Sequence, residues 1–471
     1  MIFTTSRGPA ANPFGWIDMN LQTPPQSTAH TTLDSAQLNG FHAKLALFSS
    51  GGPFLDGYIL SIIGIAMVQI QAQWNMSALW AGLIGSSALI GVFIGGAVFG
   101  AVTDRIGRKL MYMIDLTVII VCSIMQFFVH DEMQLFILRL IIGIAVGADY
   151  PIATALVTEF SPKAWRAKLV GGLNAMWFVG ATVAAFVGYL LLSMPDGWRW
   201  MLLSSAIPAI VIVIARTSIP ESPRWLQSKG RTDEALAVLK KTIGPTATFE
   251  DLPEGEDEGK TTIRALIRGG YLHRIVFISI FWTCTIVTLF AIYAFGPQIL
   301  ELFNLGSGNL AHIGYGVINV FFLIGNVVAL MLVDRLGRRA VLIWGFGLSA
   351  LGLLFLAISP QAPLWMIAAA FAVYALFNGG PSILEWIYPN ELFPTEVRAT
   401  AVGLCTGISR IGAAVGTFAT PWALTNLGLS ATMYIATGIA VVGAVISYFM
   451  APETKGKDLS QTAALDTVSG R

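Results

Sequence analysis

The stretch Asp104-Arg105-Ile106-Gly107-Arg108-Lys109 decides the fold, because it recurs as Asp334-Arg335-Leu336-Gly337-Arg338-Arg339 after 230 residues. Each copy is a short charged segment between long apolar segments. Residues 159–171 also recur, as residues 391–403, and share a glutamate, a proline, an arginine and a glycine at matching positions. Repeats that keep their order and offset indicate a duplicated structural unit.

A third motif supports the duplication. Pro220-Glu221-Ser222 recurs as Pro452-Glu453-Thr454, which is a shift of 232 residues. The three matches predict two related halves in parallel arrangement, an architecture that suits a transporter whose halves rock about a central site.

The composition indicates a protein that lies in a membrane. Of the 471 residues, 55% are hydrophobic and only 12% are charged, whereas ordinary soluble domains carry about 25% charged residues. The net charge of +1 and the lack of a basic face argue against a nucleic-acid partner. Three cysteines lie far apart in apolar runs, which excludes a disulfide framework.

Because a transmembrane helix needs about 20 apolar residues, the sequence predicts an all-α membrane protein with twelve transmembrane helices in two six-helix halves. The predicted spans of the first half are 43–70, 79–102, 110–129, 133–160, 167–194 and 198–218. Those of the second half are 274–302, 310–333, 340–359, 364–389, 399–426 and 431–451. The resulting domains are a disordered cytosolic tail (1–41), the first half (42–218), a cytosolic linker (219–273), the second half (274–451) and a cytosolic tail (452–471).

The basic residues predict the orientation. With both termini in the cytosol, Arg199 alone of the 28 basic residues lies outside, and Arg139 and Arg410 lie within spans. Cytosolic loops carry an excess of Lys and Arg, so we expect a multi-pass protein of the inner membrane with cytosolic N- and C-termini.

The repeated motifs resemble a known family. Gly100 to Lys109 match the G-x-x-x-D-R-x-G-R-K loop of the major facilitator superfamily, although Leu330 replaces the glycine in the second copy. Residues 220–226 and 389–394 look like the sugar-porter and metabolite:proton symporter branches, and the closest likeness is to enterobacterial inner-membrane metabolite transport proteins. The resemblance implies a secondary transporter that works as a monomer with a small-molecule substrate and protons.

The charged groups at the cytosolic helix ends are interpreted as a conformational lock that pairs across the two halves and exchanges partners between states. The alternative is charge that only fixes the topology. The candidate lock residues are Asp104, Arg105, Arg108, Lys109, Glu159, Arg166, Asp334, Arg335, Arg338, Arg339, Glu391 and Arg398.

Ionisable residues inside spans are costly and mark function by default. Asp56 and Asp149 are the candidate proton-coupling carboxyls, with a structural ion pair to Arg139 or Arg410 as the alternative. Arg410 is the candidate ligand of a substrate carboxylate, or else the counter-ion of Asp56 or Asp149. Arg139 is interpreted as structural.

Two further carboxyls and several aromatic residues complete the candidate site. Asp115 and Glu385 are expected close to the cytosolic surface, in the lock network. Six polar or aromatic side chains are candidate substrate-binding residues with Arg410, although in spans such residues more often serve packing. They are Tyr58, Tyr150, Trp177, Trp282, Tyr293 and Gln298.

The substrate class follows from family likeness. Residues 54–58 look like the D-G-Y-D start of aromatic-acid:proton symporters, and the Q-x-x-x-G-x-N pattern of hexose carriers is missing from Thr283 to Phe295. We therefore expect proton-coupled uptake of a small organic acid or lactone, such as an aromatic-degradation intermediate. A sugar or polyol symporter and proton-driven efflux remain alternatives. No enzyme motif is recognisable, and no cofactor or metal is expected.

Overall fold

A computed structural model describes residues 38, 40–161, 163–242, 247–249, 263–303 and 309–456, and the regular structure within these ranges is helical. The helices up to residue 242 are α1 (Gly40–Ser49), α2 (Gly51–Trp74), α3 (Ala78–Ile106), α4 (Arg108–Gln126), α5 (Glu132–Phe160), α6 (Lys163–Leu191), α7 (Gly197–Ser204), α8 (Ala206–Arg216), α9 (Pro223–Ser228) and α10 (Thr232–Thr242). The remaining helices are α11 (Ile263–Arg268), α12 (Leu272–Leu302), α13 (Asn309–Leu336), α14 (Arg338–Ile358), α15 (Leu364–Leu392), α16 (Thr395–Asn426) and α17 (Leu429–Met450).

Local sequence explains where several helices begin. Ser77 accepts a hydrogen bond from the backbone N–H of Trp80 at the start of α3, and Asp131 accepts one from Gln134 at the start of α5. A short polar side chain at this position satisfies an N–H group that the helix itself leaves free. Gly107 and Gly337 have φ angles of +100° and +92°, so each turn between two helices uses a backbone region that favours glycine.

Eleven helical segments of the described chain are long and apolar enough to cross a membrane. One of them combines α1 with α2 (Gly40–Trp74) and another combines α7 with α8 (Gly197–Arg216). The predicted span 133–160 corresponds to α5, which is not among the eleven. The chain is therefore a multi-pass helical protein, and the sequence predicted the positions of its long helices to within a few residues.

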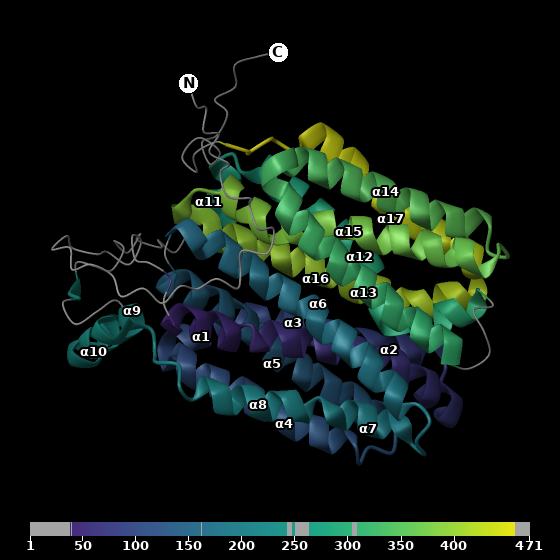
Figure 1. The fold of residues 1–471 in the computed structure, drawn as a ribbon, viewed down its shortest axis with the longest axis horizontal. Helices are drawn as coiled ribbons and strands as arrows, with labels where there is room; N and C mark the ends of the chain where they lie inside the picture. Colours follow the sequence, from purple (N-terminus) through teal and green to yellow (C-terminus); the bar gives the residue numbers. More distant parts are fainter. Residues whose placement is uncertain are drawn as a thin grey trace, which may run out of the picture.

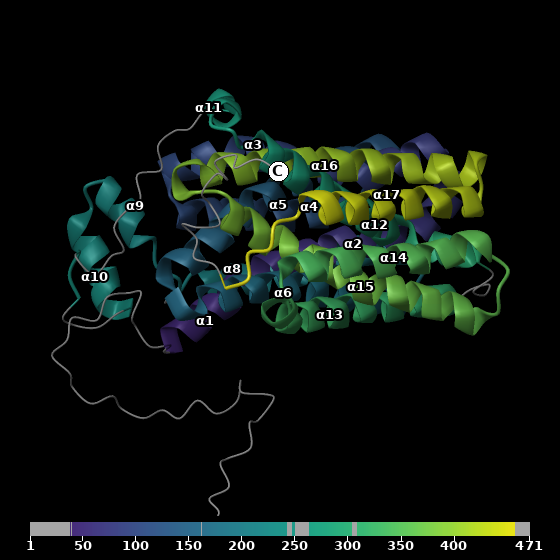
Figure 2. The same ribbon diagram turned by 90° about the horizontal axis from the view of Figure 1, so that it is seen from above.

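The helices run side by side in one elongated bundle (Figures 1 and 2). Helices of residues 40–216, the first helix group, occupy the lower part of Figure 1, and those of residues 272–450, the second helix group, occupy the upper part. Helices α9, α10 and α11 lie at one end of the bundle in both views. The predicted linker 219–273 thus contains three helices, a feature that the sequence reading did not anticipate.

The repeated motifs meet at this same end, which we call the motif end. Glu221 accepts hydrogen bonds from the backbone N–H groups of Arg108 (3.2 Å) and Lys109 (2.9 Å) at the start of α4. Glu453 accepts the equivalent bonds from Arg338 (2.9 Å) and Arg339 (3.1 Å) at the start of α14. A carboxylate at a helix N-terminus also complements the helix dipole. The sequence repeat is therefore a repeat of one capping arrangement.

Candidate functional site

A buried ion pair lies within the first helix group. Asp149 on α5 accepts a hydrogen bond from Arg216 at the end of α8, with 3.0 Å between Oδ1 and Nη1. Arg216 also donates to the backbone carbonyls of Phe48 and Ser49, and its guanidinium lies 3.8 Å from the ring centre of Tyr112. The alternative interpretation of Asp149 was a structural ion pair with Arg139 or Arg410. The structure shows an ion pair, but its partner is Arg216, near the end of the predicted span 198–218. A role of Asp149 in proton coupling stays a prediction.

The pair fits closely against α2. A β-carbon at Gly52 would lie 1.8 Å from Oδ2 of Asp149 and 2.6 Å from Nη2 of Arg216. Any side chain at this position would displace the pair, so glycine is required for the close approach.

Asp56 lies one turn further along α2 and is buried, and its Oδ2 has no hydrogen-bond partner in the described part of the chain. The charges of Asp149, Arg216 and Arg410 all act on it. Asp115 on α4 is also buried and is subject to the charges of Asp149 and Arg216. Asp115, seven residues from the start of α4, is therefore subject to the charges of this interior cluster. Its expected place near the cytosolic surface stays a prediction.

Arg410 on α16 belongs to the second helix group. It is buried, its guanidinium lies 5.7 Å from the ring centre of Phe290 on α12, and its charge acts on both Asp56 and Glu385. Glu385 on α15 is also buried, next to Trp282, and its Oε1 has no hydrogen-bond partner among the described residues. Glu385 lies seven residues before the end of α15 at Leu392, and the charge that acts on it comes from Arg410, not from a candidate lock residue. Its expected place near the cytosolic surface stays a prediction.

Arg139 on α5 is fully buried, and its Nε and Nη2 have no hydrogen-bond partner within the described ranges. No ion pair of Arg139 is present among the described residues, so its structural role stays a prediction. Among the residues that the structure describes, no three His, Cys, Asp or Glu side chains gather as a metal site would require.

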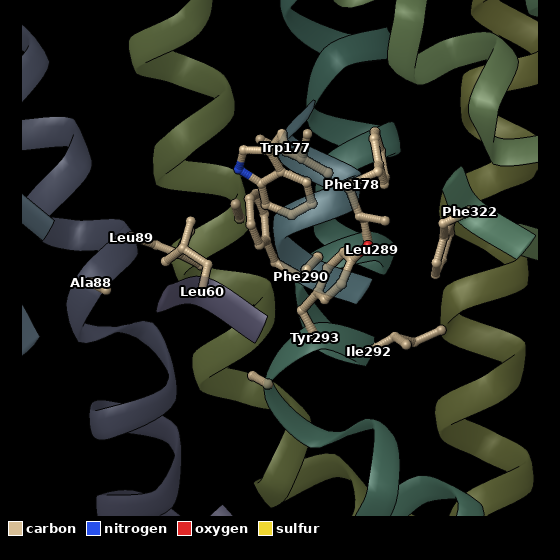
Figure 3. Close-up of a cluster of buried hydrophobic side chains, with 14 of the residues drawn as sticks. Leu60, Ala88, Leu89, Trp177, Phe178, Leu289, Phe290, Ile292, Tyr293 and Phe322 are labelled. Carbon is tan, nitrogen blue, oxygen red and sulfur yellow. The ribbon is translucent and has the colours of Figure 1, made fainter. Parts of the chain in front are cut away.

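An aromatic cluster joins the two helix groups (Figure 3). Trp177 on α6 packs edge-on against Tyr293 and Phe290 of α12, with ring centres 5.1 and 5.9 Å apart. Phe322 on α13 packs against Tyr293 and stacks with Phe178 at 6.3 Å. The predicted binding residues Trp177 and Tyr293 thus come together, and Tyr293 keeps a buried hydroxyl without a hydrogen-bond partner in the described chain.

The other predicted binding residues are dispersed. Trp282 is buried beside Glu385, and Gln298 is half-buried near the far end of α12. Tyr58 does not belong to the aromatic cluster, because its hydroxyl lies 2.6 Å from Oγ of Ser204 and its side chain lines a groove between α2, α6 and α8. The side chain of Tyr150 lies outside the described residues.

A hydrogen-bonded junction connects the groups toward the end opposite the motif end. The hydroxyl of Tyr315 on α13 lies 2.8 Å from Oγ of Ser61 on α2 and 3.1 Å from the carbonyl oxygen of Tyr293 on α12. A β-carbon at Gly64 would lie 2.2 Å from that same carbonyl oxygen. The sequence reading missed this junction, since an apolar helix gives no sign of which tyrosine faces another helix.

Helices α3 and α16 contact each other across the two helix groups. A β-carbon at Gly82, toward the opposite end, would lie 2.3 Å from the carbonyl oxygen of Phe418. A β-carbon at Gly407 would lie 3.4 Å from the side chain of Phe93 on α3. A β-carbon at Gly403 would have no described atom within 4 Å. The two groups are thus in backbone contact at Gly82 and in side-chain contact at Gly407.

The candidate lock residues lie at the motif end. Arg338 pairs with Glu391 (2.8 Å) and Asp334 (3.0 Å), and Lys455 Nζ donates to the carbonyl of Arg335. Arg339 donates to the carbonyl of Tyr448, Arg398 to that of Phe393, and Lys109 to that of Thr217. Each contact joins residues of the same half of the predicted repeat.

Pairing of the candidate lock residues across the two helix groups stays a prediction, as does a role for the exposed Arg105. The side chains of Asp104, Glu159 and Arg166 lie outside the described residues.

Comparisons with known proteins agree with this architecture. Residues 26–465 match the family model described as sugar (and other) transporter. The metabolite transport protein YaaU of Escherichia coli (strain K12) is 43% identical over 93% of this chain and 98% of its own length. The inner membrane metabolite transport protein YgcS of the same organism is 34% identical over 92% and 96%.

The solved structures include a similar fold. The major facilitator superfamily proton:xylose symporter XylE, bound to 6-bromo-6-deoxy-D-glucose, superposes with a TM-score of 0.73 and is 26% identical, over 90% of this chain and 98% of that one. The family match spans nearly the whole chain and includes both helix groups. The chain therefore belongs to the sugar (and other) transporter family, within the major facilitator superfamily.

Proposed function

We propose that this transporter imports a small organic acid or a related catabolic metabolite, such as a carboxylate or lactone from aromatic degradation, together with protons. In this proposal α5 is the twelfth span, the spans form two six-helix halves, and the motif end is cytosolic, as are both termini. The protein works as a monomer in the inner membrane.

The observation that carries the proposal is the environment of Asp56. Its carboxyl is buried, has one oxygen without a hydrogen-bond partner in the described chain, and is subject to charges from both helix groups. A carboxyl in a membrane interior can take up and release a proton when its neighbours change. Protonation of Asp56 would weaken its attraction to Arg410 and so would couple proton uptake to the position of the second group. Asp149, which has Arg216 as a fixed partner, is the second candidate.

Arg410 and Glu385 support an anionic substrate. A guanidinium can bind a carboxylate through two parallel hydrogen bonds. Glu385 acts on the same guanidinium, so a substrate carboxylate would compete with it. In this proposal Trp177, Tyr293, Trp282 and Gln298 contact the uncharged part of the substrate. Tyr58 and Tyr150 remain candidates of the same kind.

A sugar or polyol symporter is the second candidate. Several neutral polar side chains of the second helix group are buried and have polar atoms without hydrogen-bond partners in the described structure, namely Asn319, Asn326, Tyr374 and Asn378. Hydroxyl-rich substrates suit such groups, and the similar XylE is a xylose symporter. The direction of transport, import or efflux, depends on the gradients and is tested in the same assay.

Uptake into proteoliposomes tests the mechanism. We expect accumulation of a carboxylate substrate to rise with an inward proton gradient and to collapse with a protonophore. Asp56→Asn should abolish accumulation but preserve exchange of labelled for unlabelled substrate, since exchange needs no net proton movement. Accumulation that ignores the gradient in the wild type contradicts proton coupling.

Binding measurements distinguish the acid from the sugar. Arg410→Ala should abolish carboxylate binding. Glu385→Gln should tighten carboxylate binding about tenfold, or about 1.4 kcal/mol, because the competing charge is gone. Glu301→Gln, at an exposed glutamate of α12, is the matched control and should bind as the wild type does. A neutral sugar that binds equally well to all four proteins would favour the second candidate.

A further inference from the structure

A groove lies on the side of the helix bundle. It is a groove of about 570 Å³ between α2, α6 and α8. Gly51, Phe54 and Tyr58 form its α2 wall, while Met176 and Val183 of α6 face Val211 of α8. Val211 and Ile207 on its rim are 61% and 68% exposed. Since both belong to a candidate span, the groove opens to the hydrocarbon of the bilayer and not to water.

The lining suits a hydrocarbon chain. Among the described residues that line the walls, only Tyr58 and Ser204 carry hydroxyl groups. These two hydrogen-bond to each other at 2.6 Å, so neither is left unsatisfied against an apolar occupant. The α7–α8 wall runs from Ser204 to Ala215, which is about 16 Å at 1.5 Å per residue. This is close to half of the ~30 Å hydrocarbon core, the depth of one leaflet.

A positive charge lies at the mouth of the groove. Phe48 lines that end, and Nζ of the exposed Lys44 lies 5.4 Å from the centre of its ring. Arg216, which is near in the chain to Ala215, is held inside the protein by Asp149. Lys44 is thus positioned to meet an anionic group where a lipid headgroup would begin.

We propose that the groove holds one acyl chain of an anionic phospholipid from the leaflet at the motif end, with its phosphate next to Lys44. The α1–α2 junction forms the wall of the groove and also the environment of the ion pair, because Phe48 and Ser49 accept hydrogen bonds from Arg216 and Gly52 contacts Asp149. A bound chain therefore stabilises the segment that holds the interior charges. The proposal does not depend on the identity of the substrate.

Native mass spectrometry of the full-length protein, released from detergent, tests the proposal. Val211→Trp fills the groove from α8, and Val183→Trp fills it from α6 in case the first variant folds poorly. Ile214→Trp places the same side chain on an exposed position of α8 outside the groove and is the matched control. We expect the wild type and Ile214→Trp to retain one phospholipid more than either groove variant.

The headgroup is tested by adding phosphatidylglycerol or phosphatidylethanolamine. The wild type should prefer phosphatidylglycerol about fivefold, as expected for one basic side chain at the membrane surface, and Lys44→Gln should show no preference. Equal lipid retention by the wild type and both groove variants overturns the proposal. So does an unchanged preference in Lys44→Gln. A loss of substrate uptake in the groove variants with lipid retention intact also overturns it, since the groove would then be a substrate path.

Discussion

At the scale of the residue, the interior of the first helix group depends on a single guanidinium. Arg216 satisfies Asp149, two backbone carbonyls and the face of Tyr112. Removal of one partner of a buried ion pair leaves an uncompensated charge and costs about 3–5 kcal/mol. The pair therefore differs in kind from the exposed pair of Arg231 and Glu234, in which water already solvates both groups.

Arg216→Met should accordingly lower the melting temperature strongly, because Asp149 loses its partner inside the bundle. Arg231→Met, which breaks an exposed ion pair at the start of α10, should leave the melting temperature unchanged. Thermal unfolding of the purified protein in detergent measures both. A double variant, Asp149→Leu with Arg216→Met, should recover part of the loss. Equal effects of the two single variants would show that the buried pair has no special role.

At the scale of the element, each repeated motif caps a helix. Glu453 receives backbone hydrogen bonds from Lys455, Arg338, Arg339 and Thr454. Partial burial raises the pKa of the Glu453 carboxyl, but these hydrogen bonds together outweigh burial, and the pKa lies below its ordinary value of 4.5. The charged form is therefore favoured in the folded protein.

Glu453→Gln should destabilise the protein by about 1 kcal/mol at pH 7, as the loss of a helix cap does. Because the folded pKa is the lower one, the stabilisation is complete above the unfolded pKa and is lost as pH falls through the folded pKa. Melting temperatures of wild type and variant should thus converge as the pH drops below about 4.5. A difference that stays constant across this range would contradict the carboxylate cap.

Sequence hydropathy predicted the long helices, because hydropathy is a property of the chain alone. The capping of α4 by Glu221 and of α14 by Glu453 was not predicted. The partners of the charges were predicted less well. Arg216 and Glu385 lie near the ends of predicted spans, and only the packing of α8 against α4 and of α15 against its neighbouring helices shows that both are buried. The neighbours of Tyr315 likewise depend on how separate helices dock, which no local pattern encodes.

At the scale of the whole molecule, the two helix groups touch through Tyr315, Ser61 and Tyr293 away from the motif end. The groups can then change their relative tilt only if this junction loosens or shifts. A hydrogen bond of this kind contributes about 1 kcal/mol net, which is enough to bias two conformations of similar energy.

Tyr315→Phe should shift the population about fivefold toward the state that opens at the end opposite the motif end. Spin labels at Met194 and Gln361, both exposed at that end, would report a larger share of long distances. The three cysteines of the chain are buried, so labels attach to the introduced positions. Tyr434→Phe, at an exposed tyrosine of α17, is the control. An unchanged distance distribution in Tyr315→Phe would contradict the role of the junction.

The two equivalent helix caps, at Glu221 and Glu453, also suggest a test of whether the two helix groups can assemble from separate chains. Glu221 follows the last long helix of the first group and binds the start of α4, while Glu453 follows the last helix of the second group and binds the start of α14. The helix that begins after each repeated motif is thus capped by a residue of the same half. Two separately translated chains, divided between residues 249 and 263, should therefore assemble into a working transporter. Co-purification through a tag on one chain, followed by an uptake assay, would measure this.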